Sequence, residues 1–201
     1  MPRIRTLEEL REHYDAPTEE VIKKVMPALD KYSRRFVDHS PFLVIASYSD
    51  DGADVTPRGD PVGAVKMPDD RTILIADRPG NNRLDTLENI IRNPEIALLF
   101  LVPGLSETLR VNGTAEVVIG DELQQLEHRG RLPKSAIKVT VREIYFQCAK
   151  ALNRSRLWDP RAQVDKKEFP LLRQVIAEQI AGVDREDANH AVQATHGGNH
   201  P

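Results

Sequence analysis

The spacing of apolar residues changes near residue 40 of this 201-residue chain. Before that point, apolar side chains such as Val21 and Val25 recur at helical spacing. Thr6 and Thr18 are each closely followed by a pair of glutamates, which is typical of a capped helix start. The pattern therefore predicts a helical N-terminal extension over residues 1–39.

Beyond residue 40, short apolar runs bounded by turn residues predict β-strands. The first two runs flank Ser49-Asp50-Asp51-Gly52 and are expected to form a hairpin. The predicted strands cover residues 42–48, 53–58, 71–76, 95–102, 107–119 and 137–147, with 62–66 as a further candidate. The long run 107–119 is expected to bend at Gly113.

Helical segments are predicted between and after the strands. Asn82 or its neighbour is expected to cap the first of them, which Asn93-Pro94 ends. Its buried stripe is predicted to consist of Leu84, Leu87, Ile90 and Ile91. The other predicted helices cover residues 121–128, 148–153 and 169–181.

The order of these elements predicts the fold class. The βα alternation of a doubly wound sheet is missing, and most connections are short. We therefore expect a mainly β (α+β) fold, with a six-stranded antiparallel barrel over 40–160 and helices at both chain ends. Residues 161–201 are predicted to form a C-terminal helix and a polar tail, frayed from Asn189 onward, and the whole to be one structural domain.

Composition excludes several classes of protein. The 28 Lys and Arg residues nearly balance 31 Asp and Glu residues, which argues against binding nucleic acid through bulk charge. No apolar run reaches membrane-spanning length, and no secretory signal is recognisable. The single cysteine, Cys148, excludes an internal disulfide, and we expect it to be buried by packing. These features predict a cytoplasmic protein.

Familiar catalytic and metal-binding motifs are absent. There is no G-x-G-x-x-G, no P-loop and no H-E-x-x-H, so Rossmann, P-loop and zinc-protease sites have no support. Three histidines fall in the tail, at His190, His196 and His200, and we interpret them as a chance cluster rather than a metal site. No metal site is predicted.

The first candidate for chemistry is Thr56-Pro57-Arg58-Gly59-Asp60-Pro61. Arg58 ends a predicted strand, and Gly59 lets the backbone approach a ligand closely and present its N–H groups. Taken alone, an ordinary surface arginine before a Gly59-Asp60 turn is the simpler interpretation.

The second candidate follows another predicted strand. Ala76-Asp77 ends that strand, and Asn82-Arg83 stands at the start of the next helix. A helix N-terminus with a cation beside it is a ready phosphate site. A cation in the first helical turn opposes the helix dipole, and a phosphate would compensate for this. Neutralisation by Asp85 and Glu88 is an equally good interpretation.

Trp158 is the only tryptophan, and Arg154 and Arg156 precede it closely. A core anchor is the default role for such a residue. The functional alternative is a wall beside a planar ring, with an arginine nearby to meet a negative group.

Taken together, these segments resemble the pyridoxamine 5′-phosphate oxidase-like flavoproteins, which share the FMN-binding split barrel. The resemblance is closest to a bacterial branch grouped as FMN-dependent enzymes of unknown substrate. It runs over about residues 36–160 and rests on Ser40–Ser47, Asp54–Pro61, Leu74–Leu87, Glu107–Ala115, and Cys148–Leu152 followed by Leu157-Trp158.

The resemblance implies cofactor contacts at the matching positions. In the family, the strand matching Arg58 gives the arginine and backbone that meet the flavin, and the residues matching Asn82 and Arg83 bind the phosphate. The strand ending near Asp77 lines the ring, and the position of Thr108 approaches it. Set in this fold, Arg58, Asn82 and Arg83 are expected to hold the phosphate together. A homodimer with two FMN sites at the subunit interface is also implied, each completed by Trp158 and Arg154 of the other chain. The implied cofactor residues are Arg58, Gly59, Asp60, Ala76, Asp77, Asn82, Arg83, Thr108, Arg154 and Trp158.

The activity implied is that of an FMN-dependent oxidoreductase. Two alternatives remain open: the same fold holding F420 or haem, and a flavin-binding or regulatory module with no turnover. The arginine- and histidine-bearing substrate segment of the true pyridoxamine phosphate oxidases has no counterpart here, so the resemblance does not predict that substrate.

Overall fold

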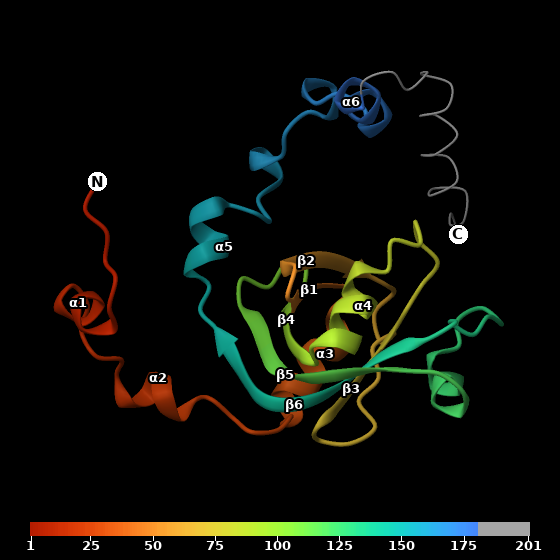
Figure 1. Cartoon of the computed structure of the whole chain (residues 1–201), viewed down its shortest axis with the longest axis horizontal. Helices are drawn as coiled ribbons and strands as arrows, with labels where there is room; N and C mark the ends of the chain where they lie inside the picture. The colour runs from red at the N-terminus through yellow and green to blue at the C-terminus, as the bar shows by residue number, and fades with distance from the viewer. Residues whose placement is uncertain (181–201) are drawn as a thin grey trace.

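The computed structural model describes residues 1–180 and contains one curled sheet of six strands (Figure 1). Their order across the sheet is β2-β1-β4-β5-β6-β3, and every neighbouring pair is antiparallel. This confirms the predicted six-stranded antiparallel split barrel in an α+β fold. The strands are β1 (Phe42–Ser49), β2 (Gly52–Gly59), β3 (Thr72–Ala76), β4 (Glu95–Leu101), β5 (Thr108–Val118) and β6 (Ala136–Gln147).

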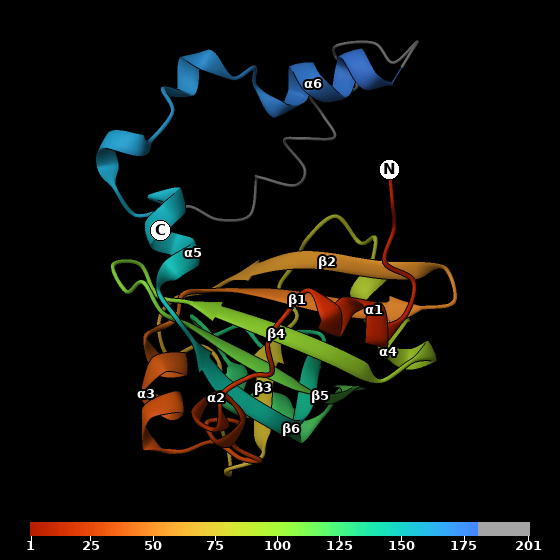
Figure 2. The same cartoon turned by 90° about the vertical axis from the view of Figure 1, so that its left-hand side faces the viewer.

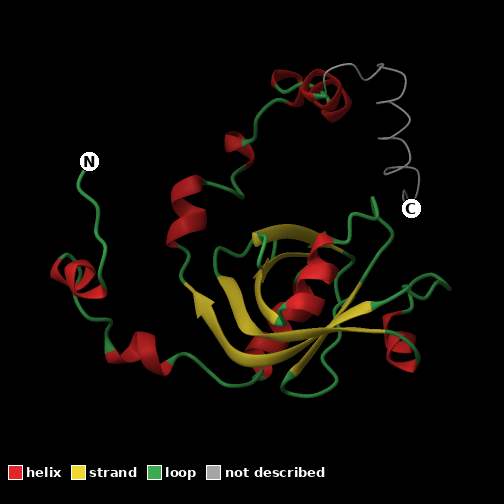
Figure 3. Ribbon diagram, viewed as in Figure 1, coloured by secondary structure: helices red, strands yellow, loops and turns green. Residues whose placement is uncertain are grey.

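Short helices surround the sheet (Figure 3). Among them, α4 packs against β1, β2 and β5. The α-helices are α1 (Leu7–Glu12), α2 (Glu19–Lys23), α3 (Lys31–His39), α4 (Asp85–Arg92), α5 (Lys150–Ser155) and α6 (Leu172–Gln179). The 3-10 segments are η1 (Asp121–Leu126), η2 (Pro160–Ala162) and η3 (Lys166–Glu168).

The barrel is split between β2 and β3. These two strands are the ends of the strand order, and they are not hydrogen-bonded to each other. Unpaired strand edges usually need covering. Here the chain that leaves β3 turns back beside β2 and continues into α4, so a cavity forms at the split.

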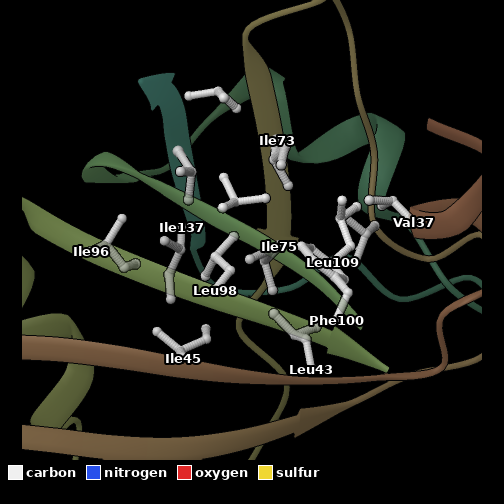
Figure 4. Packing of buried hydrophobic residues seen from close by; sticks show 14 of the residues in the cluster. Val37, Leu43, Ile45, Ile73, Ile75, Ile96, Leu98, Phe100, Leu109 and Ile137 are labelled. Atoms are coloured by element: carbon white, nitrogen blue, oxygen red, sulfur yellow. The ribbon is translucent and has the colours of Figure 1, made fainter. Parts of the chain in front are cut away.

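One hydrophobic core fills the inside of the curl (Figure 4). Ile45, Phe100, Leu109 and Val111 are completely buried there. Because side chains alternate between the faces of a strand, the other residues of β1 and β4 point away from this core. Burial of this apolar interior is the main favourable term in folding.

The outside of β1, β2 and β4 is also apolar, and we call it the outer apolar face. Val55 of β2 pairs with Ala46 of β1, which in turn pairs with Ala97 of β4, so the three side chains share one face. Val55 keeps 64% of its surface exposed. The outer apolar face consists of Phe42, Val44, Ala46, Tyr48, Val55, Pro57, Ala97, Leu99 and Leu101.

The predicted bend at Gly113 is confirmed as a register shift between Asn112 and Gly113, where β5 meets β6. A Cβ atom at Gly113 would lie 2.0 Å from the carbonyl oxygen of Thr140. Only glycine therefore allows β6 to approach this closely.

Three predicted elements differ from the observed ones. The helical spacing through Val25 does not continue, because α2 ends at Lys23 and Met26 exchanges backbone hydrogen bonds with Ile144 of β6. Residues 62–66 form no strand, since Gly63 turns the chain with a φ of 75°. The segment predicted as a helix over 121–128 is the 3-10 segment η1.

The chain ends carry the remaining helices. Thr6 caps α1 by accepting a hydrogen bond from Glu9, whereas Thr18 precedes α2 without a side-chain cap. The predicted polar tail lies outside the described residues, as does Ala181, the last residue of the predicted C-terminal helix. None of the helices in residues 1–180 has both the length and the apolar character needed to cross a bilayer.

Candidate functional site

A cavity of about 740 Å³ lies at the split of the barrel. Its walls come from β2, the chain that follows β3, the first turn of α4, and residues 132–135 just before β6. The last segment is held in place because Asp77 donates a backbone hydrogen bond of 3.0 Å to the carbonyl of Ser135. Elements far apart in the sequence therefore meet at one site.

The strand β2 turns its polar side chains toward this cavity. Thr56 pairs with the fully buried Ile45, so Asp54, Thr56 and Arg58 share the inward face of the strand. All three line the cavity. A strand that faces an ordinary core would place apolar residues here, and the inverted pattern indicates a polar ligand.

Two ion pairs connect the end of β2 and the residue after it to the chain that follows β3. Arg58 Nη1 lies 3.8 Å from Asp77 Oδ1, and Arg78 Nε lies 2.7 Å from Asp60 Oδ2. Arg78 also donates a hydrogen bond of 3.2 Å to the carbonyl of Leu126. These contacts join the two edge strands where backbone pairing does not.

Arg83 does not lie in the first turn of α4, as the sequence pattern predicted. It precedes Leu84, the N-cap, and its side chain is 74% exposed. Its Nε lies 2.8 Å from Asp85 Oδ2, so the acidic neutralisation considered from the sequence does occur. The argument from an unfavourable helix dipole therefore does not apply to Arg83.

The start of α4 is also capped differently from the prediction. Leu84 is the N-cap in a left-handed conformation (φ 61°), and no side chain caps the helix. Asn82, the expected cap, has a φ of 59° instead. Left-handed backbone is costly for a residue such as leucine. The uncapped helix start, with its unsatisfied N–H groups, borders the cavity through Asp85 and Thr86.

Lys134 is a cation of the cavity that sequence reasoning missed. It lies on the segment before β6, is exposed, and lines the same cavity as Arg83. Arg58, Arg78 and Arg83 each contact a carboxylate, whereas Lys134 makes no ion pair within residues 1–180. No local motif marks it, because only the pairing of β6 with β3 brings it to the site.

A second, smaller cavity of about 170 Å³ adjoins the first. The two share Arg58, Arg78, Pro79 and Gly80 in their walls. Three of the candidates predicted from the sequence lie only at the smaller cavity, namely Gly59, Asp60 and Ala76.

The remaining candidates divide into two groups. Arg58, Asp77, Asn82 and Arg83 line the larger cavity, as a shared cofactor site requires. Three others line neither cavity of this chain, namely Thr108, Arg154 and Trp158.

Thr108 and Trp158 have other partners within the chain. Thr108 pairs with Leu101, so it faces outward, and it donates a hydrogen bond of 3.3 Å to Gln147. The Trp158 indole donates a hydrogen bond of 2.8 Å to the carbonyl of Leu105. Cys148 is exposed, so the expectation that it is buried was wrong.

Beside Trp158, two arginines surround one carboxylate. Hydrogen bonds from Arg161 and then from Arg156 lower the pKa of Asp159 to about 2. The turn after α5 is therefore held by charge at any pH well above that value.

A family model for pyridoxamine 5′-phosphate oxidase matches residues 29–148. The chain belongs to this family. The matched stretch contains all six strands, α4 and every residue that lines the larger cavity. No curated protein matches the chain.

Several solved structures are similar to this chain at low identity. HupZ of Group A Streptococcus is 19% identical with a TM-score of 0.48, over 59% of this chain and 93% of HupZ. A pyridoxamine 5′-phosphate oxidase candidate from Lactobacillus delbrueckii is 20% identical with a TM-score of 0.47, over 60% and 95% of the two chains. The FAD binding protein from Mycobacterium smegmatis is 14% identical with a TM-score of 0.41, over 61% and 97%.

Proposed function

We propose that this protein is an FMN-dependent oxidoreductase whose cofactor lies in the larger cavity. The observation that carries the proposal is the meeting of cationic side chains and an uncapped helix start at one cavity, in a chain of the pyridoxamine 5′-phosphate oxidase family. Helix N-termini and nearby cations are the usual way that proteins hold a phosphate.

The cavity suits a flavin nucleotide in size and chemistry. Its volume of about 740 Å³ falls in the range of about 300–1,000 Å³ typical of small-molecule sites. Arg83, Lys134 and the N–H groups at the start of α4 would hold the phosphate. Leu84, Leu132 and Pro133 add apolar surface suited to a planar ring.

FMN, when bound, supplies hydride or electron transfer. The chain contributes binding and orientation: its cations neutralise the phosphate. The paired Arg58 and Asp77 place polar groups along the inward face of the split. We assign no acid or base to the protein.

The protein is further proposed to act as a homodimer through the outer apolar face. The strand β2 supports this, because Asp54, Thr56 and Arg58 lie on its inward face, while Val55 on the opposite face borders the cavity and still keeps 64% of its surface exposed. Thr108 lies on the same outward side as Leu101. A second copy on this face would allow Arg154 and Trp158, which line neither cavity of their own chain, to contribute to the partner's cavity, whereas Thr108 is buried within its own chain.

The absorbance of the purified protein and the mass of the compound it releases test the cofactor proposal directly. We expect a yellow protein with bands at about 375 and about 450 nm, typical of an oxidised flavin, and release of a compound with the mass of FMN. A colourless protein that takes up no FMN would refute the proposal. Release of F420 or haem would show that this compound, and not FMN, is the cofactor. Bound FMN that no electron donor reduces would favour a non-catalytic binding module.

A further inference from the structure

The first 24 residues of the chain, which we call the N-terminal arm, bury no side chain on the barrel. All of them are exposed, and neither α1 nor α2 buries a residue. These helices have only six and five residues. Isolated helices this short are not stable in water, so helices in proteins depend on packing of an apolar face.

The N-terminal arm nevertheless carries apolar side chains suited to such packing. Leu7 on α1 is 76% exposed, and Ile22 on α2 is 59% exposed. Ile4, Leu10, Tyr14 and Val21 are exposed along the same arm. Within the described part of the chain, nothing covers them, so the arm presents a surface that needs a partner.

The arm leaves the barrel from a fixed point. Lys24 Nζ donates a hydrogen bond of 3.0 Å to the carbonyl of Phe146 and lies 5.6 Å from the centre of the Tyr145 ring. Met26 and Ile144 exchange backbone hydrogen bonds of 2.9 and 2.8 Å. Because the end of β6 anchors the arm, the direction in which it projects is defined.

The arm projects on the side of the outer apolar face. In Figure 2, α1 lies in front of β1 and β4, and Figure 1 shows that it stands away from them. The chain beyond α5 behaves similarly at the other end, where Trp158 is anchored to Leu105 and the following segment extends away from the barrel (Figure 2). That segment exposes Val164, Phe169, Leu171 and Leu172.

We propose that the N-terminal arm packs against a second copy of this chain that occupies the outer apolar face. A two-fold dimer presents the same surface from both subunits, so a copy seated on this face would come within reach of the arm that projects over it. Each subunit would then cover the partner's arm and bury apolar residues that its own barrel leaves exposed. This inference rests on the homodimer of the proposed function.

The experiment compares dimer dissociation constants by sedimentation velocity. A variant with both Leu7→Asp and Ile22→Asp should raise the dissociation constant about tenfold or more, because charge replaces apolar contact at the interface. Its circular dichroism should keep the β-sheet signal of a folded barrel, since both side chains are exposed in one chain and lie outside the sheet. Ile119→Asp, at a residue 75% exposed just after β5, is the matched control and should leave the constant unchanged.

Two results would overturn the inference. One is a double variant that dimerises as tightly as the wild type. The other is a wild-type chain that stays monomeric at all concentrations, which would mean that a different partner covers the arm. FMN uptake is measured on the same samples. A weakened dimer in a chain that takes up no FMN would leave the arm contact standing while the cofactor proposal failed.

Discussion

At the scale of single residues, the cations of the cavity differ in what they already contact. Arg58 faces Asp77 at 3.8 Å and Arg78 faces Asp60 at 2.7 Å, and these pairs join the edge strands. Lys134 has no such partner in the described residues. A phosphate can therefore bind Lys134 without breaking an existing ion pair. Arg83 pairs with Asp85 at 2.8 Å, but this pair is exposed and does not join the edge strands, so a phosphate can replace it without separating β2 from β3. Lys134 and Arg83 are therefore the better phosphate ligands.

Substitution of either cation should weaken FMN binding selectively. We expect Arg83→Ala and Lys134→Ala each to cost more than about 1.5 kcal/mol of FMN binding, because a charge-assisted contact is lost. Riboflavin lacks the phosphate, so its affinity should change much less. Fluorescence titration of both ligands measures the difference.

Lys138→Ala is the control for these variants, because Lys138 pairs with Glu116 and Glu122 and does not line the cavity. It should bind FMN as the wild type does. Equal losses of FMN and riboflavin affinity in Arg83→Ala and Lys134→Ala would contradict a phosphate role.

The sequence pattern could predict some of these residues but not others. Arg58 and Arg83 are recognisable because they stand near the ends of predicted elements. Lys134 lies on an irregular segment, and it reaches the site only because Ala136 pairs with Ala76. A contact across 60 positions of the chain leaves no local signal, so no spacing rule would have found it.

At the scale of elements, β2 is informative because its inward face carries polar side chains and its outward face carries apolar ones, the reverse of an ordinary strand at a core. The strand predicted over 53–58 carries Asp54, Thr56 and Arg58 on the face next to the cavity, and Val55 and Pro57 on the opposite face. Periodicity alone cannot tell which face is inward. The register with β1 decides it, through the pairing of Thr56 with Ile45.

The start of α4 shows where cap signals mislead. Asn82 has the side chain of a typical N-cap, yet Leu84 takes that position without a capping side chain. Strained backbone is often found at functional sites, and Asn82 and Leu84 both line the cavity. The preference for a capping side chain therefore gave way at the site itself.

The bulge in β5 gives a stability prediction at this scale. Gly113→Ala should lower the free energy of unfolding by about 2–3 kcal/mol, because the new Cβ overlaps the Thr140 carbonyl and forces β5 and β6 apart. Urea denaturation measures this. Gly59→Ala places its Cβ at an ordinary 3.7 Å from the nearest atom and should change stability little. Similar values for both variants would contradict the role given to Gly113.

At the scale of the whole molecule, one sheet forms three distinct regions. Its inside forms the core, its split holds the cavity, and its outside presents the outer apolar face. The sequence could predict the strands and the fold class, because each strand has its own apolar pattern. It could not predict that the N-terminal arm projects on the side of the outer apolar face, since that depends on the anchor at Phe146.

The most direct test of the phosphate-holding cavity is the ratio of wild-type affinities for FMN and riboflavin. The two ligands differ only in the phosphate, and two charge-assisted contacts are together worth about 3 kcal/mol or more. We therefore predict that the protein binds FMN about 100-fold more tightly than riboflavin in equilibrium fluorescence titrations. Equal affinity for the two ligands would contradict the account.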